Sequence, residues 1–428
     1  MSGSRTDPAA ESEHVAGNGL LHRRLFLTRG LTLAGAFGVA GQASAQPAPQ
    51  PAHPEWMKRQ GGGLSGYGRP SKFEEGVKRI AGQPNPIFPS VGSTRTPLEK
   101  LNGMITPNGL HFERHHSSVP AIDPAAHRLM IHGLVRAPLA WDMSALMRYP
   151  MTSVIRFIEC SGNSGAAKRS VPQTSVGQIH GLVSCSEWTG IKLSHLLDET
   201  GLLDGASWII AEGAEAASMV RSIPLETALD DVIVALYQNG ERIRPEQGYP
   251  MRLLVPGCEG SVNVKWVHRI KVVSAPGDSR DETGQYTDLL PGGRALQYTL
   301  LMDVKSVITH PSVGMKLSQS GLYEVSGLAW SGHGAIRRVE VTADGGKSWA
   351  DAELASPVLP KCLTRFRIPW AWTGGPATLA SRATDDRGNV QPTHEVAIAR
   401  YGEAGAYHYN GIQPWAVSQA GEVANVRL

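Results

Sequence analysis

Short apolar runs of strand length dominate the chain between residues 96 and 298, and modest helical patterns separate them. The clearest of these runs are Val154 to Ile158, Val232 to Leu236 and Leu253 to Val255. Apolar runs of this length, bounded by turn residues, are typical of buried strands. The alternation of such strands with short helices predicts a mixed α+β domain over residues 96–298.

Residues that begin and end helices mark the helical segments of the same region. Asp142 can cap a helix that Pro150 stops, and Ser194 to Leu197 begins another that Gly201 closes. The segment Ser222-Ile223-Pro224-Leu225 predicts a helix start with proline in the first turn.

The pattern changes near Leu300, where strand-like segments follow one another with almost no helical periodicity. Tyr323 to Trp330 and Arg338 to Thr342 have the composition of strands, and the turn at Asp344-Gly345-Gly346 follows the second. Strands and turns at this spacing predict an immunoglobulin-like β-sandwich over residues 299–402. Residues 403–428 are expected to form a tail that packs across a domain or subunit surface.

The N-terminal pattern is that of a leader. Arg23-Arg24-Leu25-Phe26-Leu27 is a twin-arginine start, an apolar run from Leu31 to Ala40 follows, and Ala43-Ser44-Ala45 fits a cleavage site. We therefore expect residues 1–45 to be a twin-arginine signal peptide that sends a folded protein to the periplasm. The apolar run is too short and too glycine-rich for a membrane span. Residues 46–95 begin with prolines and are typical of an extended arm.

Composition narrows the class of protein. A chain of 428 residues with 41% hydrophobic and 18% charged residues can bury a sizeable core, which excludes a mostly disordered protein. The net charge of +3 is small and well mixed, which argues against nucleic-acid binding. The four cysteines include no C-x-x-C pair, which excludes a zinc ribbon or a thioredoxin motif. Two disulfides are possible in the periplasm, but folding before export favours at least one free thiol.

One apolar strand leads directly into a loop of small residues, Cys160-Ser161-Gly162-Asn163-Ser164-Gly165. Backbone amides in such a loop can approach a ligand, and a cysteine thiolate there can bind a soft transition metal. Two other interpretations stay open from these residues alone. The cysteine can be a small buried hydrophobe, and the loop lacks only the last glycine of a serine hydrolase's nucleophile elbow.

Two further segments combine cationic residues with turns. Phe112 to Pro120 contains Arg114-His115-His116, and adjacent histidines on an extended chain point to opposite faces. This segment is either a polar turn or a place where arginine and histidine hold an anion. In Gln247 to Lys265 a buried strand alternates with glycine turns. Arg252 and Lys265 can grip a phosphate there, although an ordinary β-hairpin has the same pattern.

Together these segments resemble the molybdenum-cofactor enzymes of the sulfite oxidase family over residues 96–402. The motifs that carry the resemblance are Arg114 to Pro120, Cys160 to Asn163, Ser222 to Leu225, Gly248 to Arg252, Val255 to Gly257, Asn263 to Trp266, Gly346 to Trp349, Trp370 to Trp372 and Asn389 to Pro392. The resemblance implies a sulfite-oxidase-type molybdopterin domain followed by an immunoglobulin-like domain that dimerises. It also implies the molybdenum-molybdopterin cofactor (Moco).

The same resemblance implies the roles of individual residues. Cys160 would be the only protein ligand to molybdenum, and Tyr286 and Arg114 would act with it in catalysis. The implied cofactor-binding residues are Phe112, Arg114, His116, Cys160, Arg252, Ser261, Asn263 and Lys265. Counting onward from Lys265 places the family's active-site tyrosine at Tyr286, where a buried loop phenol is the alternative.

Departures from the family pattern bear on the substrate. Gly165 and Ile368 stand where the family's sulfite enzymes carry substrate-binding arginines, and Gln247 replaces a histidine that contacts the pterin. Fewer fixed cations weaken the binding of a small dianion. Within the family the chain is therefore most similar to the SoxC-type molybdenum subunits of sulfane dehydrogenases, which act on sulfane sulfur bound to a carrier protein.

This similarity implies partners and a reaction. The expected substrate is a SoxYZ-like sulfur carrier of thiosulfate oxidation, and the expected electron acceptor is a SoxD-like c-type cytochrome subunit. The chain has no C-x-x-C-H motif and so attaches no c-type haem itself. A homodimer, or a heterotetramer with the cytochrome, is expected. The alternatives are a sulfite dehydrogenase that acts on free sulfite and a non-enzymatic periplasmic binding protein.

Overall fold

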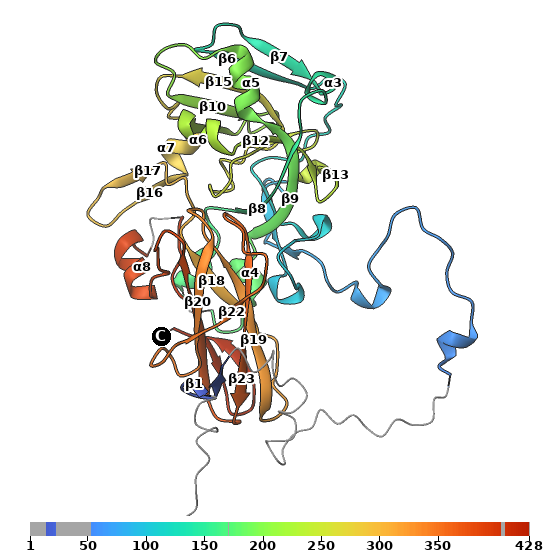
Figure 1. Ribbon diagram of the computed structural model, residues 1–428, viewed down its shortest axis with the longest axis vertical. Coiled ribbons are helices and arrows are strands. Elements are labelled where there is room, and N and C mark those ends of the chain that lie inside the picture. Colours follow the sequence, from blue (N-terminus) through green and yellow to red (C-terminus); the bar gives the residue numbers. More distant parts are fainter. Residues whose placement is uncertain (1–13, 23–52, 170, 404–406, 428) are drawn as a thin grey trace, which may run out of the picture.

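The computed structural model describes residues 14–22, 53–169, 171–403 and 407–427. An α+β unit and a β-sandwich lie end to end in an elongated molecule, and an arm leaves one side (Figure 1). The twin arginines, the apolar run and the predicted cleavage site of the leader lie outside the described residues. Within the described ranges, no helix is long and apolar enough to cross a membrane.

The α+β unit contains two sheets of five strands each. One has the order β11-β10-β15-β6-β7 and is antiparallel except between β15 and β6. Its strands are β6 (Arg128–Gly133), β7 (Leu139–Asp142), β10 (Trp208–Gly213), β11 (Val220–Pro224) and β15 (Val267–Val273). The other has the order β13-β12-β9-β8, with β14 also paired to β12. Its strands are β8 (Thr152–Glu159), β9 (Val183–Lys192), β12 (Ile233–Gln238), β13 (Glu241–Arg242) and β14 (Arg252–Leu254).

The predicted helices after Asp142 and before Gly201 both form, but the first ends at Leu146, ahead of Pro150, and the second begins at Leu193, one residue before Ser194. The Asp142 carboxylate accepts a hydrogen bond from the amide of Ala145 and caps α3 (Met143–Leu146), and Gly201 ends α5 (Leu193–Thr200). The expected proline in a first helical turn is wrong, because Pro224 still pairs in β11 and α6 (Leu225–Asp230) starts after it. Elsewhere in the described residues, the helices are α4 (Val176–His180), α7 (Arg280–Gly284) and, in the sandwich region, α8 (His394–Tyr401), with the 3₁₀ turns Glu55–Lys58, Lys72–Glu74, Leu98–Lys100, Asn108–Leu110, Gly165–Lys168 and Pro245–Gln247.

Two sheets form the sandwich predicted from the strand and turn spacing. The first holds β1 (His14–Ala16), β2 (Leu20–Leu21), β18 (Lys305–His310), β19 (Gly321–Trp330), β22 (Glu353–Leu354) and β23 (Thr364–Trp372). The second holds β20 (Ile336–Thr342), β21 (Ala350–Asp351), β24 (Ala377–Asp385), β25 (Trp415–Val417) and β26 (Val423–Asn425). Beyond residue 402 the segment predicted as a tail therefore supplies two strands of the second sheet.

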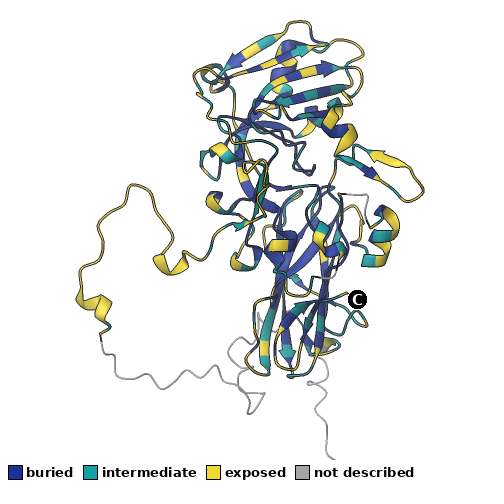
Figure 2. Cartoon of the chain, turned by 180° about the vertical axis from the view of Figure 1, so that it is seen from behind, coloured by how far each residue is buried: buried dark blue, intermediate teal, exposed yellow. Residues whose placement is uncertain are grey.

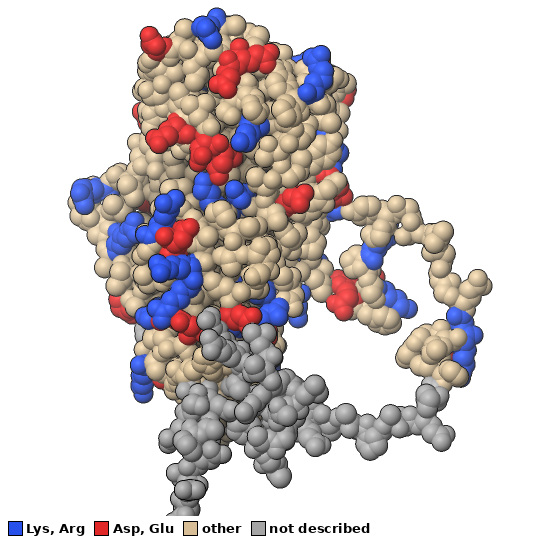
Figure 3. Space-filling view, in the orientation of Figure 1, with Lys and Arg blue, Asp and Glu red and all other residues tan. Residues whose placement is uncertain are grey.

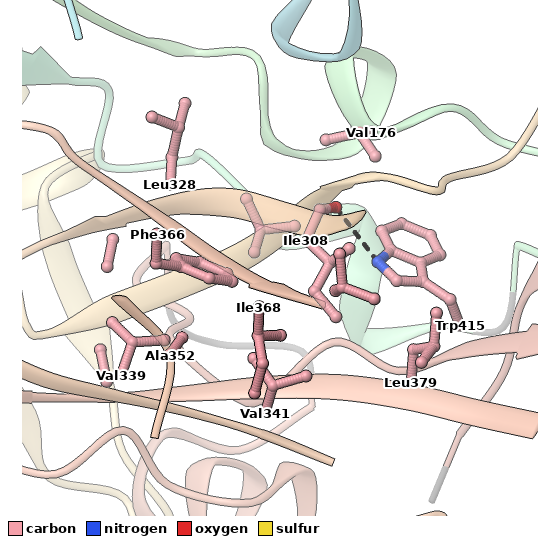
Figure 4. Close-up of a cluster of buried hydrophobic side chains, with 14 of the residues drawn as sticks. Val176, Ile308, Leu328, Val339, Val341, Ala352, Phe366, Ile368, Leu379 and Trp415 are labelled. Carbon is pink, nitrogen blue, oxygen red and sulfur yellow. Dashed lines mark hydrogen bonds between the residues drawn. The ribbon is translucent and has the colours of Figure 1, made fainter. Parts of the chain in front are cut away.

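Aromatic side chains fill the space between the two sheets of the sandwich. Trp330, Phe366 and Trp415 are fully buried, and the Trp415 indole N–H donates to the carbonyl of Ile308 at 3.2 Å (Figure 4). Truncating one such side chain to alanine typically costs about 3–5 kcal/mol. The core of the sandwich is thus dense enough to hold its edges in place.

The two units share apolar contacts and do not meet only at a surface. Phe157, Val183 and Cys185 from β8 and β9 belong to the same buried cluster as Trp330 of the sandwich. The Sγ atom of Cys185 lies 3.4 Å from that of Cys362, which precedes β23. Figure 2 shows that the elements of both units are largely buried where the units meet. The end of β8, and with it Cys160, is therefore held from both sides.

The arm before the α+β unit is mostly exposed (Figure 2). Its large exposed hydrophobic side chains are Trp56, Met57, Leu64, Tyr67, Phe73, Ile87 and Phe88. The arm joins the body through the small sheet of β3 (Ile80–Ala81), β4 (Gly92–Arg95) and β5 (Glu113–His115). A separate ribbon, β16 (Thr287–Leu289) with β17 (Ala295–Gln297), projects on the opposite side in Figure 1.

Candidate functional site

The loop after β8 holds Cys160 in a fixed position. The Cys160 amide donates to the carbonyl of Leu182 at 2.9 Å, and its own carbonyl accepts from the amide of Asn163 at 2.9 Å. The Asn163 side chain in turn accepts from the amide of Leu182 at 3.0 Å. Burial raises the pKa of the Cys160 thiol, whereas the Gly162 amide and the Arg114 guanidinium oppose that rise. A soft metal ion that displaced the proton would therefore find a pre-positioned sulfur.

Strand β5 brings its charged residues to the same pocket. Arg114 donates to the carbonyl of His115 and lies close enough to Cys160 to affect its pKa. The His115 ring lies between Glu113, at 2.9 Å, and the amine of Lys265, at 2.8 Å. His116 points to Tyr286 instead, as expected for adjacent side chains on an extended strand. Both histidines nevertheless line the pocket.

Two cations at the back of the pocket are poorly compensated. Burial lowers the pKa of Arg252 to about 9, and burial together with the charge of Arg252 lowers that of Lys265 to about 7. The Lys265 amine donates to the carbonyls of Arg114 and Glu246, at 3.1 and 3.2 Å. Arg252 donates to the carbonyl of Asn263 at 2.9 Å. Apart from His115, these partners are neutral carbonyls, and the carboxylates of Glu215 and Glu113 attract Lys265 without forming an ion pair with it among the described residues, so positive charge remains available for an anion.

Several polar atoms that face the pocket have no partner among the described residues. They are Nε2 of His111, Oε2 of Glu215 and Nε of Arg252. Buried polar groups are almost always hydrogen-bonded in folded proteins. Burial lowers the pKa of His111 to about 3, so the ring is neutral at physiological pH. The pocket therefore has unused hydrogen-bonding capacity for a polar ligand.

Tyr286 lies at the front of the pocket among aromatic and cationic groups. Its hydroxyl is 3.0 Å from Nε2 of His116, and burial raises its pKa while burial lowers that of His116 to about 4. The guanidinium of Arg221 lies 4.5 Å from the centre of the Tyr286 ring. Tyr407 also stacks on Tyr286, with ring centres 5.8 Å apart. Tyr286 is thus a protonated phenol fixed between two strands and the C-terminal segment.

The sandwich supports the cysteine loop through one buried carboxylate. Glu159, which precedes Cys160, is fully buried and accepts from the Lys305 amine at 2.6 Å and the Trp330 indole at 2.7 Å. The Asn163 side-chain amide donates to the same carboxylate at 2.9 Å. Lys305 and Trp330 come from β18 and β19. The second unit therefore fixes the residue next to the candidate metal ligand.

All nine residues predicted from the sequence line one pocket. They are Phe112, Arg114, His116, Cys160, Arg252, Ser261, Asn263, Lys265 and Tyr286. Gln247 lines it too and donates to the carbonyl of Phe112 at 2.8 Å. Ile368 does not, because it is fully buried in the sandwich core. Its identity therefore says nothing about the charge of the pocket, and that part of the substrate argument was wrong.

Sequence reasoning missed three residues that shape the site. Arg221 is fully buried, pairs with Glu259 at 2.6 Å and also donates to Ser261. The only feature of the sequence that could have pointed to Arg221 was its position directly before the Ser222 to Leu225 motif. The charge of Glu159 at the end of an apolar strand was a better signal. Tyr407 lay in the segment predicted as a tail, and nothing in its local pattern pointed to the pocket.

These residues fit the molybdenum cofactor. The thiol of Cys160 lies at the start of its loop and lines the pocket, where it suits a soft transition metal. Opposite it, Arg252 and Lys265 offer charge to a phosphate, and the unpartnered His111 and Glu215 atoms offer hydrogen bonds to a polar ring system. On the face shown in Figure 3, by contrast, basic and acidic side chains are interspersed. On this face the positive charge is therefore not spread over a broad basic surface.

Comparison with known proteins supports the same interpretation. Residues 116–280 match the oxidoreductase molybdopterin binding domain, and residues 297–414 match the Mo-co oxidoreductase dimerisation domain. The chain is 31% identical to mitochondrial sulfite oxidase of Mus musculus over 68% of its own length and 58% of that protein. It is 33% identical to nitrate reductase [NADH] 1 of Oryza sativa subsp. japonica over 69% of its length. It spans only 37% of the rice protein.

A solved structure matches most of the chain. The crystal structure of the sulfane dehydrogenase SoxCD from Paracoccus pantotrophus contains a chain that is 43% identical, with a TM-score of 0.85. The match covers 87% of this chain and 97% of that one. The predicted order of domains and the predicted cofactor agree with these matches. The chain belongs to the sulfite oxidase family of molybdenum-cofactor oxidoreductases, with a Moco-binding domain followed by a dimerisation domain.

Proposed function

We propose that this protein is the molybdenum subunit of a periplasmic sulfane dehydrogenase. In this proposal it oxidises sulfane sulfur bound to a carrier protein and passes the electrons to a c-type cytochrome subunit. The observation that carries the proposal is the 43% identity to a chain of sulfane dehydrogenase SoxCD, across 97% of that chain. The similarity to a sulfite oxidase is lower, at 31%, and covers a smaller share of this chain.

The pocket residues have distinct tasks in this proposal. Cys160 would hold molybdenum through its thiolate, while Arg252 and Lys265 would neutralise the phosphate of the pterin. The bound cofactor supplies a two-electron oxidation of sulfur in which water is the source of oxygen. Arg114 adds a positive charge beside Cys160, where negative charge on a sulfur substrate would gather. The Tyr286 hydroxyl lies 3.0 Å from Nε2 of His116. This contact fixes the hydroxyl, a proton donor, in the lining of the pocket.

The entrance of the pocket supports a delivered substrate. A side-chain carbon added at Gly165 would meet nothing within 4 Å, so the loop beyond Cys160 is open on that side. Tyr407 is 45% exposed, and its ring lies 3.3 Å from the position of a Cβ at Gly162. An open approach beside an exposed aromatic side chain suits a peptide arm that carries the sulfur. A free dianion gains little from either feature.

Turnover with two substrates tests the choice of reaction. Cytochrome c reduction is measured with sulfane sulfur on its carrier and, separately, with free sulfite. We expect turnover with the loaded carrier and little with sulfite. Rapid turnover of sulfite together with none of the loaded carrier would assign a sulfite dehydrogenase instead.

A single substitution tests the proposed metal ligand. Cys160→Ser should lower turnover by about 100-fold or more, because the hydroxyl is a poor ligand where a thiolate is needed. Cys362→Ala is the matched control, since its thiol is buried outside the pocket. Near-UV circular dichroism and elemental molybdenum are measured for both. Full activity of Cys160→Ser with bound molybdenum would overturn the ligand assignment.

The proposal also covers assembly and location. The dimerisation domain of residues 297–414 supports a homodimer through the sandwich, and a cytochrome subunit would extend it to a heterotetramer. Export as a folded protein follows from the twin-arginine leader. Mass photometry of the purified protein with and without the cytochrome measures the assembly, and a monomer at micromolar concentration would contradict it.

A further inference from the structure

A short segment of the predicted leader is part of the sandwich in this structure. Residues 14–22 form the hairpin β1–β2, and Leu20 pairs with Trp370 of β23 (Figure 1). Leu20 is fully buried and Leu21 nearly so, and Leu20 belongs to the apolar cluster of the sandwich. A leader that serves only as an export signal and is then removed does not need to bury leucines in the core of the mature protein.

The tip of the hairpin is held by specific polar contacts. The amide of Ala371 donates to the carbonyl of Gly19 at 2.8 Å, and the Trp370 indole donates to the carbonyl of Asn18 at 2.8 Å. The Asn18 side chain donates to the carbonyl of Ala343 at 2.8 Å. On the other side, the Gly17 amide donates to the Ser348 hydroxyl at 2.6 Å. These contacts come from strand β23 of one sheet and from the β20–β21 connection of the other, so they exist only when the sandwich is folded.

The two glycines of the tip permit this close approach. A Cβ at Gly19 would lie 2.1 Å from the carbonyl oxygen of Ala371, and one at Gly17 would lie 2.3 Å from a carboxylate oxygen of Asp344. Gly19 also has φ +90°, in the region that favours glycine. A larger residue at position 19 would clash with backbone and not with a movable side chain. The hairpin therefore fits this edge of β23 sterically as well as by hydrogen bonding.

We propose that residues 15–21 are an intramolecular ligand of the folded sandwich, docked in the precursor before export. Strand pairing and burial withdraw the peptide bonds of a segment from proteases. Arg23 and Arg24 follow directly in the sequence. The docked hairpin thus protects residues 15–21, shortly before the twin-arginine pair, while the sandwich is folded, and leaves them open to proteolysis when the sandwich is not. This inference rests on the twin-arginine leader of the proposed function.

Proteolysis of the full precursor tests the docking. Arg23→Lys with Arg24→Lys keeps the full chain in the cytoplasm, from which it is purified. Thermolysin, which cuts beside leucine, then acts on this chain and on the same chain with Gly19→Val. We expect cleavage near Leu20 at least tenfold faster in Gly19→Val. Gly61→Val is the matched control, since a Cβ there meets nothing within 4 Å, and its cleavage near Leu20 should equal that of the parent.

Hydrogen exchange gives a second readout that does not depend on the protease. Peptides that contain Gly19 to Leu21 should exchange slowly in the precursor and rapidly in Gly19→Val, while β19 and β24 stay protected in both. Equal cleavage of the two chains, or exchange of Gly19 to Leu21 at the rate of an unstructured peptide, would overturn the inference. Neither outcome bears on the substrate, because no turnover is measured. Failure of the proposed reaction would leave these results unchanged.

Discussion

Two lysines of this protein, Lys265 and Lys305, are withdrawn from solvent in opposite ways. Lys305 is buried and lies 2.6 Å from the Glu159 carboxylate, which also accepts from Trp330 and Asn163. Lys265 contacts carbonyl oxygens and His115, and its near neighbour Arg252 carries the same charge. The first charge is matched within the protein. The second has no carboxylate at ion-pair distance among the described residues and is only partly offset by Glu215 and Glu113.

This difference in charge pairing distinguishes a lysine that supports the structure of the loop from a lysine that can bind a ligand. A buried, hydrogen-bonded ion pair fixes geometry, and removing one partner leaves an uncompensated charge. An unmatched cation in a pocket destabilises the empty protein, but an anionic ligand relieves that cost when it binds. Lys305 therefore holds the loop of Cys160, while Lys265 is available for an anion. The first three of the four predictions that follow test this contrast, and the fourth tests the entrance of the pocket.

The largest effect is expected for the supporting pair. Lys305→Met should lower the free energy of unfolding by about 3–5 kcal/mol, because Glu159 would stay buried without its cation. The double change Lys305→Met with Glu159→Gln should recover most of that loss. Urea unfolding followed by circular dichroism measures both. A loss below about 1 kcal/mol in the single variant would show that the pair does not support the loop.

The matched change in the pocket should act on binding instead. Lys265→Met should leave the stability of the cofactor-free protein unchanged or raised, since it removes an unmatched charge. Loss of one charged hydrogen bond to phosphate should weaken cofactor binding by about 10- to 100-fold. Molybdenum and pterin content after maturation measure this loss. If Lys265→Met were instead as destabilising as Lys305→Met, the two lysines would have the same role.

The same contrast predicts a dependence of stability on pH. Burial lowers the pKa of Lys265 to about 7, so between pH 7 and about 10 the unfolded chain binds a proton that the folded chain has lost. The contribution of Lys265 to stability therefore rises with pH in this window, by up to about 1.4 kcal/mol per pH unit. Unfolding of the cofactor-free protein at pH 7 to 9 measures it. The free energy of unfolding of Lys265→Met should rise less steeply with pH than that of the parent protein. Parallel curves of this free energy against pH for the two proteins would contradict the prediction.

The smallest effect is expected at the entrance. Tyr407→Leu removes an aromatic contact with Tyr286, and such contacts contribute about 0.5–1.5 kcal/mol. If the peptide arm of the carrier uses this side chain, KM for the loaded carrier should rise by roughly two- to tenfold with kcat retained. Sulfite turnover should not change. An equal change for both substrates would place Tyr407 among the structural residues of the pocket.

Much of the site followed from sequence, because its residues stand in ordered motifs at the ends of predicted strands. Cys160 follows β8, and Arg252 and Lys265 flank a predicted buried strand and its glycine turns. Tyr286 was placed by the resemblance to the sulfite oxidase family, by counting onward from Lys265, and it lines the same pocket. Each short motif keeps its spacing inside one loop or strand, and the family resemblance joined these motifs into one site; only Tyr286 had to be counted across β15 and α7.

The long-range contacts were not predictable in this way. The pairing of Glu159 with Lys305 joins residues 146 positions apart, and no periodicity reports such a distance. The stacking of Tyr407 on Tyr286 and the docking of Leu20 on Trp370 are of the same kind. Ile368 shows the opposite error, because a motif match suggested a place in the pocket and burial put the residue in the sandwich core. Sequence motifs predict where the functional loops lie along the chain. The residues that each loop contacts depend on tertiary packing, which the motifs do not predict.

The carboxylate of Glu159 has a consequence for how such proteins can be recombined. A molybdopterin domain cut out at residue 298 would keep Glu159 but lose both Lys305 and Trp330. Phe157 and Val183 would lose their apolar cover in the same cut. The unit that can be exchanged between relatives is therefore not the domain that sequence matches delimit. In a chimaera that exchanges either half, Glu159, Lys305 and Trp330 must all come from the same parent protein, although they lie in two domains.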